Sequence, residues 1–399
     1  MASSDPHNIV ILGGSYAGMG VAHKLLKDLP SLEKEAGKRF KVTMISNSTH
    51  FWFSVGAPRA MLRPYPKDIM DSFIPISKGF SQYPSSAFDF VFAEISSLET
   101  SKREVLYNLK SQQNETEEVA SETSTMHYDT LVLATGSKGP DPLYSYHGSH
   151  LPTLNAYKDV QGRLPGANSV MVVGGGSAGT ETAGELGYLH GKSTKSPKNI
   201  TILSGNQRLL PALRASIGAK AEEFLTKMGV KVVHNVKLDS QTELPDGKTQ
   251  VKLSNGETEE VDLLLVAVGR KPVSDWLPSS IPLTKSGQVE CDGYMRVSSQ
   301  PATWVTGDLA SISNGGLIYL QTMTPCLAGN IIAELKGKGQ EAMKLHQPLT
   351  TKEMQFVPVG PEKGVGALFG WAAPSFMVTM VKGKNMFFPN AMKGVMGTL

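Results

Sequence analysis

Residues 169–190, SVMVVGGGSAGTETAGELGYLH, contain the clearest indication of the fold. A short apolar run predicts a strand, the glycines predict a tight turn, and the following residues predict a helix to about His190. Gly174, Gly176 and Gly179 form the pattern GxGxxG. In this pattern the first glycine makes the turn, the second lets the backbone approach a pyrophosphate, and the third allows close helix–strand packing. Ser177 opens the helix, whose free N–H groups and dipole favour a phosphate. We therefore expect dinucleotide binding here.

The same arrangement occurs about 160 residues earlier, where Asn8–Leu12 (NIVIL) precedes the turn GGSYAG. Each turn and helix is followed by a second apolar run, at residues 41–45 and 199–203. Strand, glycine turn, helix and strand form the βαβ unit of a nucleotide-binding sheet, so two such units predict two dinucleotide sites. The expected cofactor-binding residues of the first turn are Gly13, Gly14, Ser15, Ala17 and Gly18. Ser15 stands where the second glycine of the pattern would be.

Three later segments indicate which dinucleotide each unit holds. Ala134-Thr135-Gly136 and Ala267-Val268-Gly269 each follow an apolar run, and Thr306-Gly307-Asp308 precedes a helix. After two βαβ units, an Asp in the last position is typical of contact with the ribitol or pyrophosphate of FAD. We therefore expect FAD in the first unit and NADH or NADPH in the second. The cofactor-binding residues expected in these segments are Ala134, Thr135, Gly136, Gly269 and Asp308.

The predicted fold is an α/β flavoprotein of the two-dinucleotide, glutathione-reductase-like type. It would have an FAD domain (1–150 and 290–335), an NAD(P)H domain (151–289) and a C-terminal cap (336–399). The polar stretch Ser111–Thr125 is expected to form a solvated hairpin loop, Met126–Thr135 one strand, and Thr324–Leu335 a helix.

The second strands end without the acid that commonly binds an adenosine ribose. Ser46 and Ser204 stand at these ends, and we expect Ser46 to lie at the cofactor. Absence of an acid near the second site removes repulsion of a 2′-phosphate, and Arg208 lies nearby in the sequence. Arg208 could bind that phosphate or lie on the surface, so the sequence leaves the choice between NADH and NADPH open.

Composition narrows the class of protein further. The 399 residues carry a net charge of +3 and include two cysteines, Cys291 and Cys326, with no CxxC pair. This disfavours dithiol chemistry and a disulfide-rich secreted fold, and we expect no nucleic-acid partner and no metal site. No apolar signal region and no long apolar run occur, so a cytoplasmic protein is expected. Oligomerisation is left open.

Nearly the whole chain resembles the ferroptosis-suppressor-type, apoptosis-inducing-factor-like FAD-dependent NAD(P)H:quinone oxidoreductases. The matching segments are residues 131–140 (LVLATGSKGP), 155–159 (NAYKD), 172–179 (VVGGGSAG), 306–308, and a C-terminal V-x-x-V-K-x-K-x-x-F that contains Lys382 and Phe387. The resemblance implies hydride transfer from NAD(P)H through FAD to a quinone. It also implies that Arg59 helps to hold FAD, that Glu181 faces NAD(P)H, and that Lys382 and Phe387 lie beside the flavin and the quinone entrance. Ser15, Ser46 and the lack of an N-terminal myristoylation site depart from the family.

Each of these roles has a simpler alternative. Glu181 could only complement a helix dipole, and Lys382 could be a surface lysine with a buried stem. The segment Pro374–Met392 could rest on a membrane or lipid-droplet surface, pack on the FAD domain, or form a dimer interface. Two other functions compete with quinone reduction, namely reduction of a protein electron carrier and an NAD(P)H-sensing effector role without fast turnover.

Overall fold

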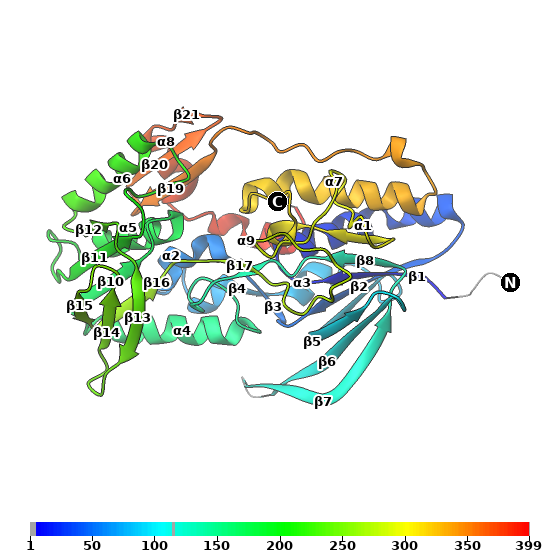
Figure 1. Cartoon of the computed structure of the whole chain (residues 1–399), viewed down its shortest axis with the longest axis horizontal. Coiled ribbons are helices and arrows are strands. Elements are labelled where there is room, and N and C mark those ends of the chain that lie inside the picture. Colours follow the sequence, from blue (N-terminus) through cyan, green and yellow to red (C-terminus); the bar gives the residue numbers. More distant parts are fainter. Residues whose placement is uncertain (1–4, 114–115, 399) are drawn as a thin grey trace.

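The computed structural model describes residues 5–113 and 116–398, and its first unit is built on a seven-stranded sheet (Figure 1). Strands β18, β8, β1, β2 and β5 are parallel, and β5, β6 and β7 continue as an antiparallel extension. In sheet order the strands are β18 (Thr303–Val305), β8 (Thr130–Leu133), β1 (His7–Leu12), β2 (Phe40–Ser46), β5 (Phe88–Glu99), β6 (Glu104–Gln113) and β7 (Thr116–His127). A central strand buried on both faces needs a continuous apolar run, and residues 9–12 are fully buried.

Helices α1 (Tyr16–Ala36) and α7 (Leu317–Leu335) lie side by side on this sheet (Figure 1). The close approach depends on a small residue, because a β-carbon at Gly20 would lie 2.8 Å from Thr324 Cγ2. Smaller elements complete the unit. They are β3 (His50–Trp52), α2 (Ala57–Ala60), β4 (Phe73–Pro75) and α3 (Ile76–Phe80). Helix α4 (His150–Arg163) lies in the chain that leads to the second unit and packs against β3.

The second unit has a parallel four-stranded sheet in the order β12 (Lys231–His234), β11 (Asn199–Ser204), β10 (Ser169–Val173) and β16 (Leu263–Val266). Side chains of β10 alternate between two apolar clusters, as the two-residue period of a strand requires. Val170 and Val172 belong to the main core, which includes residues of α5 (Ser177–His190) and α6 (Ala215–Lys227). Met171 and Val173 pack instead with the antiparallel meander β13 (Leu238–Glu243), β14 (Thr249–Leu253) and β15 (Thr258–Val261).

Two short strands mark where the chain passes between the units. Ser137–Lys138 (β9) pairs antiparallel with Lys271–Pro272 (β17). The chain thus leaves the first unit and returns to it at neighbouring points, and β18 then adds to the edge of the first sheet beside β8. The second unit is an insertion in the first. The domain boundaries predicted from the sequence stay a proposal.

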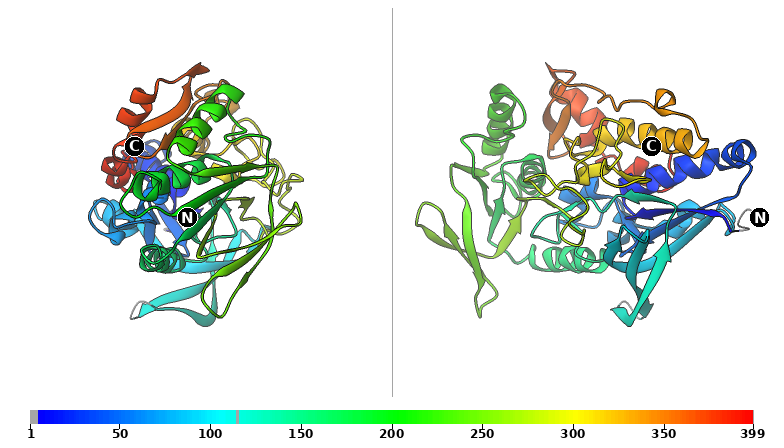
Figure 2. Two further views of the ribbon diagram at one scale, coloured as in Figure 1. Left: turned by 90° about the vertical axis from the view of Figure 1, so that its left-hand side faces the viewer. Right: turned by 45° about the vertical axis from the view of Figure 1, so that its right-hand side comes forward.

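The C-terminal tail, residues 355–395, packs on both units. Its sheet β19 (Gln355–Val359), β20 (Lys363–Leu368) and β21 (Trp371–Ala372) lies on α5 and α6, and a β-carbon at Gly184 of α5 would lie 2.7 Å from Val359 Cα. Helix α8 (Ser375–Val378) and a π-helical turn (Thr379–Gly383) follow. A 3₁₀ turn (Phe388–Asn390) and α9 (Ala391–Val395) then reach α1, where the Val395 carbonyl lies 2.7 Å from His23 Nε2. Figure 2 shows the tail running along one side of the molecule, next to helices of both units.

Three expectations about local structure were wrong. A hairpin lies at Ser111–Thr125 as expected, but its residues are strand rather than loop wherever the structure describes them. Strands β6 and β7 extend through it and pair antiparallel, with one register shift between Asn108 and Lys110. Their backbone pairing compensates for the polar side chains, and the hairpin projects from the sheet (Figures 1 and 2). The expected strand Met126–Thr135 is interrupted between His127 and Thr130, and α7 begins at Leu317, seven residues before the predicted start.

Candidate active site

The first glycine turn is built so that only glycine fits at two of its positions. Gly13 has φ +121°, and a β-carbon there would lie 2.4 Å from the Ala134 carbonyl oxygen. A β-carbon at Gly18 would lie 1.9 Å from the Gly13 oxygen. Ser15 is the exposed N-cap of α1, but its side chain makes no capping hydrogen bond. The first N–H groups of α1 are thus left for a ligand, and this turn fits a dinucleotide phosphate.

The second turn repeats this geometry and opens into a cavity. Gly174 has φ +128° with the Ala267 oxygen 2.4 Å from its added β-carbon, and Gly179 meets the Gly174 oxygen at 1.9 Å. At Gly176 an added β-carbon meets nothing within 4 Å. Gly176 lines a cavity of about 890 Å³ together with the end of β16. Ser177 follows as the first residue of α5. The cavity and the uncapped helix fit a nicotinamide nucleotide.

The segments after β8 and β16 adopt matching turns. Gly136 has φ +68° and Gly269 has φ +61°. Thr135 Oγ1 donates a hydrogen bond of 2.8 Å to the Val273 carbonyl, which fixes the turn rather than pointing a hydroxyl at a ligand. Gly269 lines the 890 Å³ cavity. In both turns, a backbone carbonyl of the segment lies directly beside the first glycine of the neighbouring glycine turn.

Asp308 sits where the sequence predicts a cofactor-binding acid. It lies in the 3₁₀ turn Gly307–Leu309, and its Oδ2 accepts a hydrogen bond of 2.6 Å from Ser137 Oγ. A β-carbon at Gly307 would lie 3.0 Å from Ala17 Cβ, so this turn touches the first turn of α1. The structure therefore brings together Asp308, Ala17 and the first glycine turn, and Asp308 keeps a side chain that is about one third exposed.

The serines at the ends of β2 and β11 use their hydroxyls internally. Ser46 Oγ donates to the Ser48 carbonyl, and Ser204 Oγ donates to the carbonyls of Asn206 and Arg208. Both serines are buried, and each lies against the middle of its glycine turn. A direct cofactor contact by Ser46 stays a prediction, while its observed role is to close the strand end.

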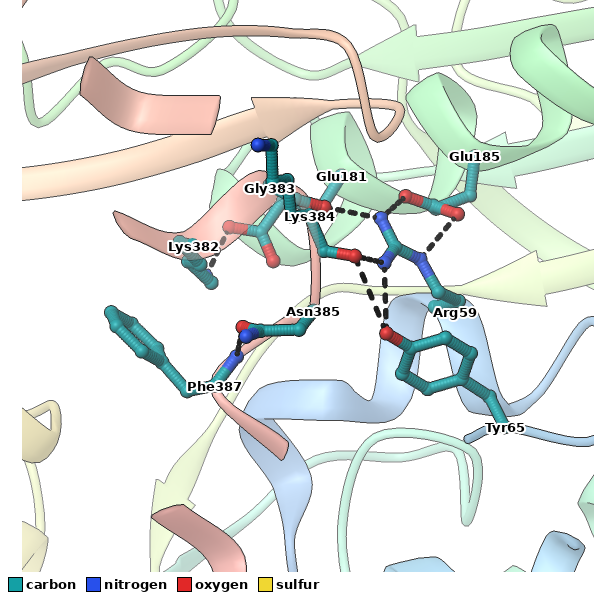
Figure 3. A network of polar contacts seen from close by, with 9 residues as sticks. All are labelled: Arg59, Tyr65, Glu181, Glu185, Lys382, Gly383, Lys384, Asn385 and Phe387. Carbon is teal, nitrogen blue, oxygen red and sulfur yellow. Dashed lines mark hydrogen bonds and ion pairs between the residues drawn. The ribbon is translucent and has the colours of Figure 1, made fainter. Parts of the chain in front are cut away.

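Arg59 lies in α2 and is only 1 % exposed. Its Nε and Nη2 donate to the two oxygens of Glu185, on α5, at 2.8 and 2.7 Å. Its Nη1 and Nη2 also donate to the carbonyls of Lys384 and Gly383, in the tail (Figure 3). The guanidinium thus joins the first unit, the second unit and the tail. An FAD contact by Arg59 stays a prediction, and these partners favour a role in holding the three segments together.

A second ion pair lies beside the first. Lys382 Nζ donates to Glu181 Oε1 at 2.5 Å, and the side chains are 12 % and 5 % exposed (Figure 3). Burial raises the pKa of the Glu181 carboxyl, and the Lys382 ammonium partly offsets this effect. Lys382 is therefore not a solvated surface lysine. The pair connects α5 to the π-helical turn of the tail.

Phe387 follows this turn in a strained conformation. Met386 and Phe387 have φ values of +50° and +60°, which bulky residues rarely adopt. The Phe387 N–H donates to Asn385 Oδ1 at 3.1 Å, and its half-buried ring points away from the Arg59–Glu185 pair (Figure 3). Strain of this kind persists only where surrounding contacts fix it, and it occurs often at functional sites.

Reasoning from the sequence did not identify Glu185. Glu181 and Glu185 are four residues apart, so they share one face of α5, and this spacing is a signal that could have found both. Arg208 was left with two interpretations, and its guanidinium donates to the carbonyls of Leu210, Pro211 and Leu213. Cys291 and Cys326 are free thiols.

The fold and the site are those of the class of two-dinucleotide flavoproteins. The structure has two nucleotide turns, an acid at the cofactor end of the first sheet, and a tail that packs on both units. The family model of pyridine nucleotide-disulphide oxidoreductases matches residues 7–333, and the chain belongs to this family. FAD and NAD(P)H are its cofactors.

Individual relatives extend this result. The chain is 31% identical to oxidoreductase ptaL of Pestalotiopsis fici over 98% of this chain and 99% of that protein. It is 25% identical to ferroptosis suppressor protein 1 of Xenopus tropicalis over 96% and 95%. Among solved structures, the sulfide:quinone oxidoreductase of Aquifex aeolicus has a TM-score of 0.68 at 15% identity, over 98% of this chain and 92% of that one, which shows the shared fold. The resemblance expected for nearly the whole chain is thus confirmed as a distant relationship at about 25% identity, and a differently named oxidoreductase is more similar.

Proposed function

We propose that this protein is an FAD-dependent NAD(P)H:quinone oxidoreductase. The observation that carries the proposal is the buried Glu181–Lys382 pair, held where α5 of the second unit meets the tail. The two cysteines form no dithiol, so the disulfide chemistry in the family's name lacks its usual groups in this chain. The resemblance of the tail to quinone-reducing flavoproteins supports the same acceptor.

The overall reaction is NAD(P)H + H⁺ + quinone → NAD(P)⁺ + quinol. A bound FAD would supply the chemistry of hydride acceptance from the nicotinamide and of two-electron donation to the acceptor. Glycines 13 and 18 with Asp308 would hold FAD, and glycines 174, 176 and 179 would hold NAD(P)H. The quinone oxygens become negative as they gain electrons, so a nearby cation and proton donor lowers the barrier. Lys382 Nζ would supply that charge and proton, and Glu181 Oε1 would orient it and hold the proton between turnovers.

The first test compares Lys382→Met with wild type by anaerobic stopped-flow. FAD-loaded protein is reduced with NADH or NADPH, and reoxidation by a short-chain ubiquinone is followed by flavin absorbance. Loss of a general acid typically slows the step about 10²- to 10⁴-fold. We expect reoxidation by quinone to slow within that range. Since Lys382 lowers the pKa of Glu181, its removal should also move the Glu181 titration to higher pH in the rate profile.

Lys384→Met is the matched control, because Lys384 is exposed and only its backbone carbonyl binds Arg59. It should reoxidise at the wild-type rate. Reduced wild-type flavin that reacts with a ferredoxin-type carrier but not with quinone would replace this proposal by the carrier-reductase alternative. A long-lived reduced state with both acceptors would favour the sensing role.

The tail also offers a contact for a lipid surface. Trp371, Phe376 and Met380 are 79 %, 72 % and 62 % exposed within ten residues of chain, and Lys384 follows. No helix of the described residues is long and apolar enough to cross a membrane. We infer peripheral attachment through these side chains, next to the residues that would face a lipid-soluble quinone. Trp371→Ser/Phe376→Ser should reduce flotation with vesicles of anionic lipid, and unchanged flotation would exclude this surface.

A further inference from the structure

The cavity beside the second glycine turn contains an unassigned cation at its β11 side. Lys237 lies in the connection from β12 to β13 and lines the cavity together with Gly205, the residue that directly follows β11. In nucleotide-binding sheets of this type, the end of the second strand is where the adenosine ribose is read. An acid there binds the 2′-hydroxyl of NADH, whereas a cation accommodates the 2′-phosphate of NADPH.

The backbone holds Lys237 over this strand end. The N–H groups of Asn235 and Val236 donate to the carbonyls of Asn206 and Ser204, at 3.1 and 3.2 Å. The connection therefore crosses the end of β11. A β-carbon at Gly205 would lie 3.0 Å from Lys237 Cγ and 3.3 Å from its Cε, so the stem of the lysine runs along the glycine. Gly205 leaves room for this stem where other members of the fold class place an acid.

Arg208, the cation that the sequence suggested, is committed elsewhere. Its guanidinium donates to three carbonyls of the loop 210–213 and fixes that loop. Lys237 is exposed, and the ion pairs in the described part of the chain do not include it. Of these two basic side chains, Lys237 has the charge available for a ligand.

One acid of the cavity, Asp141, is held away from the end of β11. Asp141 receives N–H hydrogen bonds from Leu143 and Val266, and Val266 belongs to β16, two strands from β11 in the sheet order. Two strand spacings are about 10 Å, beyond the reach of a hydrogen bond. Asp239 lines the cavity two residues after Lys237 and is exposed.

We propose that Lys237 determines nucleotide specificity by binding the 2′-phosphate of NADPH, so that this protein prefers NADPH to NADH. The inference rests on the proposed role of the cavity as the NAD(P)H site and is independent of the electron acceptor. The 2′-phosphate, with a charge of about −1.5 to −2, accepts charge-assisted hydrogen bonds from an ammonium. NADH has a hydroxyl at this position instead.

Nucleotide binding to the FAD-loaded full chain tests the proposal without turnover. Isothermal titration with NADP⁺, NAD⁺, 2′,5′-ADP and 5′-AMP would compare wild type, Lys237→Ala and Lys237→Arg. Loss of a hydrogen bond to a charged group weakens binding by roughly 10- to 100-fold. We expect Lys237→Ala to lose that factor for NADP⁺ and 2′,5′-ADP and to change less than about twofold for NAD⁺ and 5′-AMP. Lys237→Arg should keep most of the wild-type affinity for NADP⁺ and 2′,5′-ADP, because it keeps the positive charge.

Lys231→Ala is the matched control, since Lys231 is an exposed lysine at the start of β12 outside the cavity lining. It should bind all four probes like wild type. Equal losses for both pairs of probes in Lys237→Ala, or tighter wild-type binding of NAD⁺ than of NADP⁺, would overturn the inference while leaving the oxidoreductase proposal intact. Failure of wild type to bind either dinucleotide would overturn the assignment of the cavity itself.

Discussion

The two glycine turns have nearly the same backbone and differ in sequence at two positions. Gly13 and Gly174 have φ values within 10° of each other, and each would place a β-carbon 2.4 Å from an alanine carbonyl. Gly18 and Gly179 close on their turns at the same 1.9 Å. Ser15 stands against Gly176, both at helix N-caps and both exposed, and Tyr16 stands against Ser177 at the first helical position.

The comparison separates two uses of glycine. At the first and last positions of the pattern, neighbouring backbone atoms of the protein exclude a side chain. At Gly176 the protein leaves space, so no protein atom requires glycine there. In the proposed NAD(P)H site the ligand would be the group that requires it, whereas Ser15 shows that the first turn holds a side chain at the same position.

The largest expected effect is a loss of stability on removing the Arg59–Glu185 ion pair, which joins the two units that carry the turns. Arg59→Ala leaves Glu185 buried without its partner, and loss of one member of a buried pair destabilises proteins by about 3–5 kcal/mol. Chemical denaturation would measure the free energy of unfolding. Replacing both partners, as in Arg59→Met/Glu185→Leu, should recover part of the loss. A midpoint for Arg59→Ala like that of wild type would show that the junction adds no stability.

A smaller effect should distinguish the two turns by the ligand that each holds. Gly18→Ala and Gly179→Ala each force a β-carbon onto a carbonyl oxygen, and overpacking of this kind costs about 1–3 kcal/mol. We expect Gly18→Ala to lose bound flavin, and Gly179→Ala to keep its yellow colour but lose reduction by NAD(P)H. Gly162→Ala in α4 has open space and should behave like wild type. Loss of flavin from both turn variants would contradict the assignment of separate ligands.

The smallest effect on stability is expected from exchanging the side chains at Ser15 and Gly176, the N-cap positions of the two helices. Gly176→Ser and Ser15→Gly should each change unfolding by no more than about 0.5 kcal/mol, because neither side chain has a protein partner. Gly176→Ser should nevertheless weaken NAD(P)⁺ binding several-fold in a titration, since its β-carbon stands in the cavity. Wild-type affinity in Gly176→Ser would mean that the ligand does not approach this backbone closely.

Local patterns predicted the nucleotide turns because strand, glycine turn and helix are contiguous in the sequence. They could not predict contacts made across long separations. Arg59 meets Glu185 126 residues later and Gly383 324 residues later, and no local signal identifies such partners. Lys237 reaches the end of β11 from the connection between β12 and β13, more than thirty residues after Ser204. The sequence close to Ser204 therefore indicated only Arg208.

The polar composition of one segment led to a wrong prediction, because backbone pairing between strands determines its structure. The residues from Ser111 to Thr125 have the polarity of a loop, yet β6 provides hydrogen-bonding partners for β7 over most of its length. The strained Met386–Phe387 turn is equally invisible in the sequence, since neither residue favours positive φ.

The position of β18 also affects how the chain acquires its structure during synthesis. The edge of β8 that pairs with Thr303–Val305 is made about 170 residues before those residues leave the ribosome. The inserted sheet of β10–β12 and β16 is complete earlier and can form while β8 still presents unpaired N–H and C=O groups. An open strand edge is a template for incorrect pairing. The first half of the nascent chain therefore keeps an unpaired strand edge until the last strand of its sheet is made, although it is synthesised first.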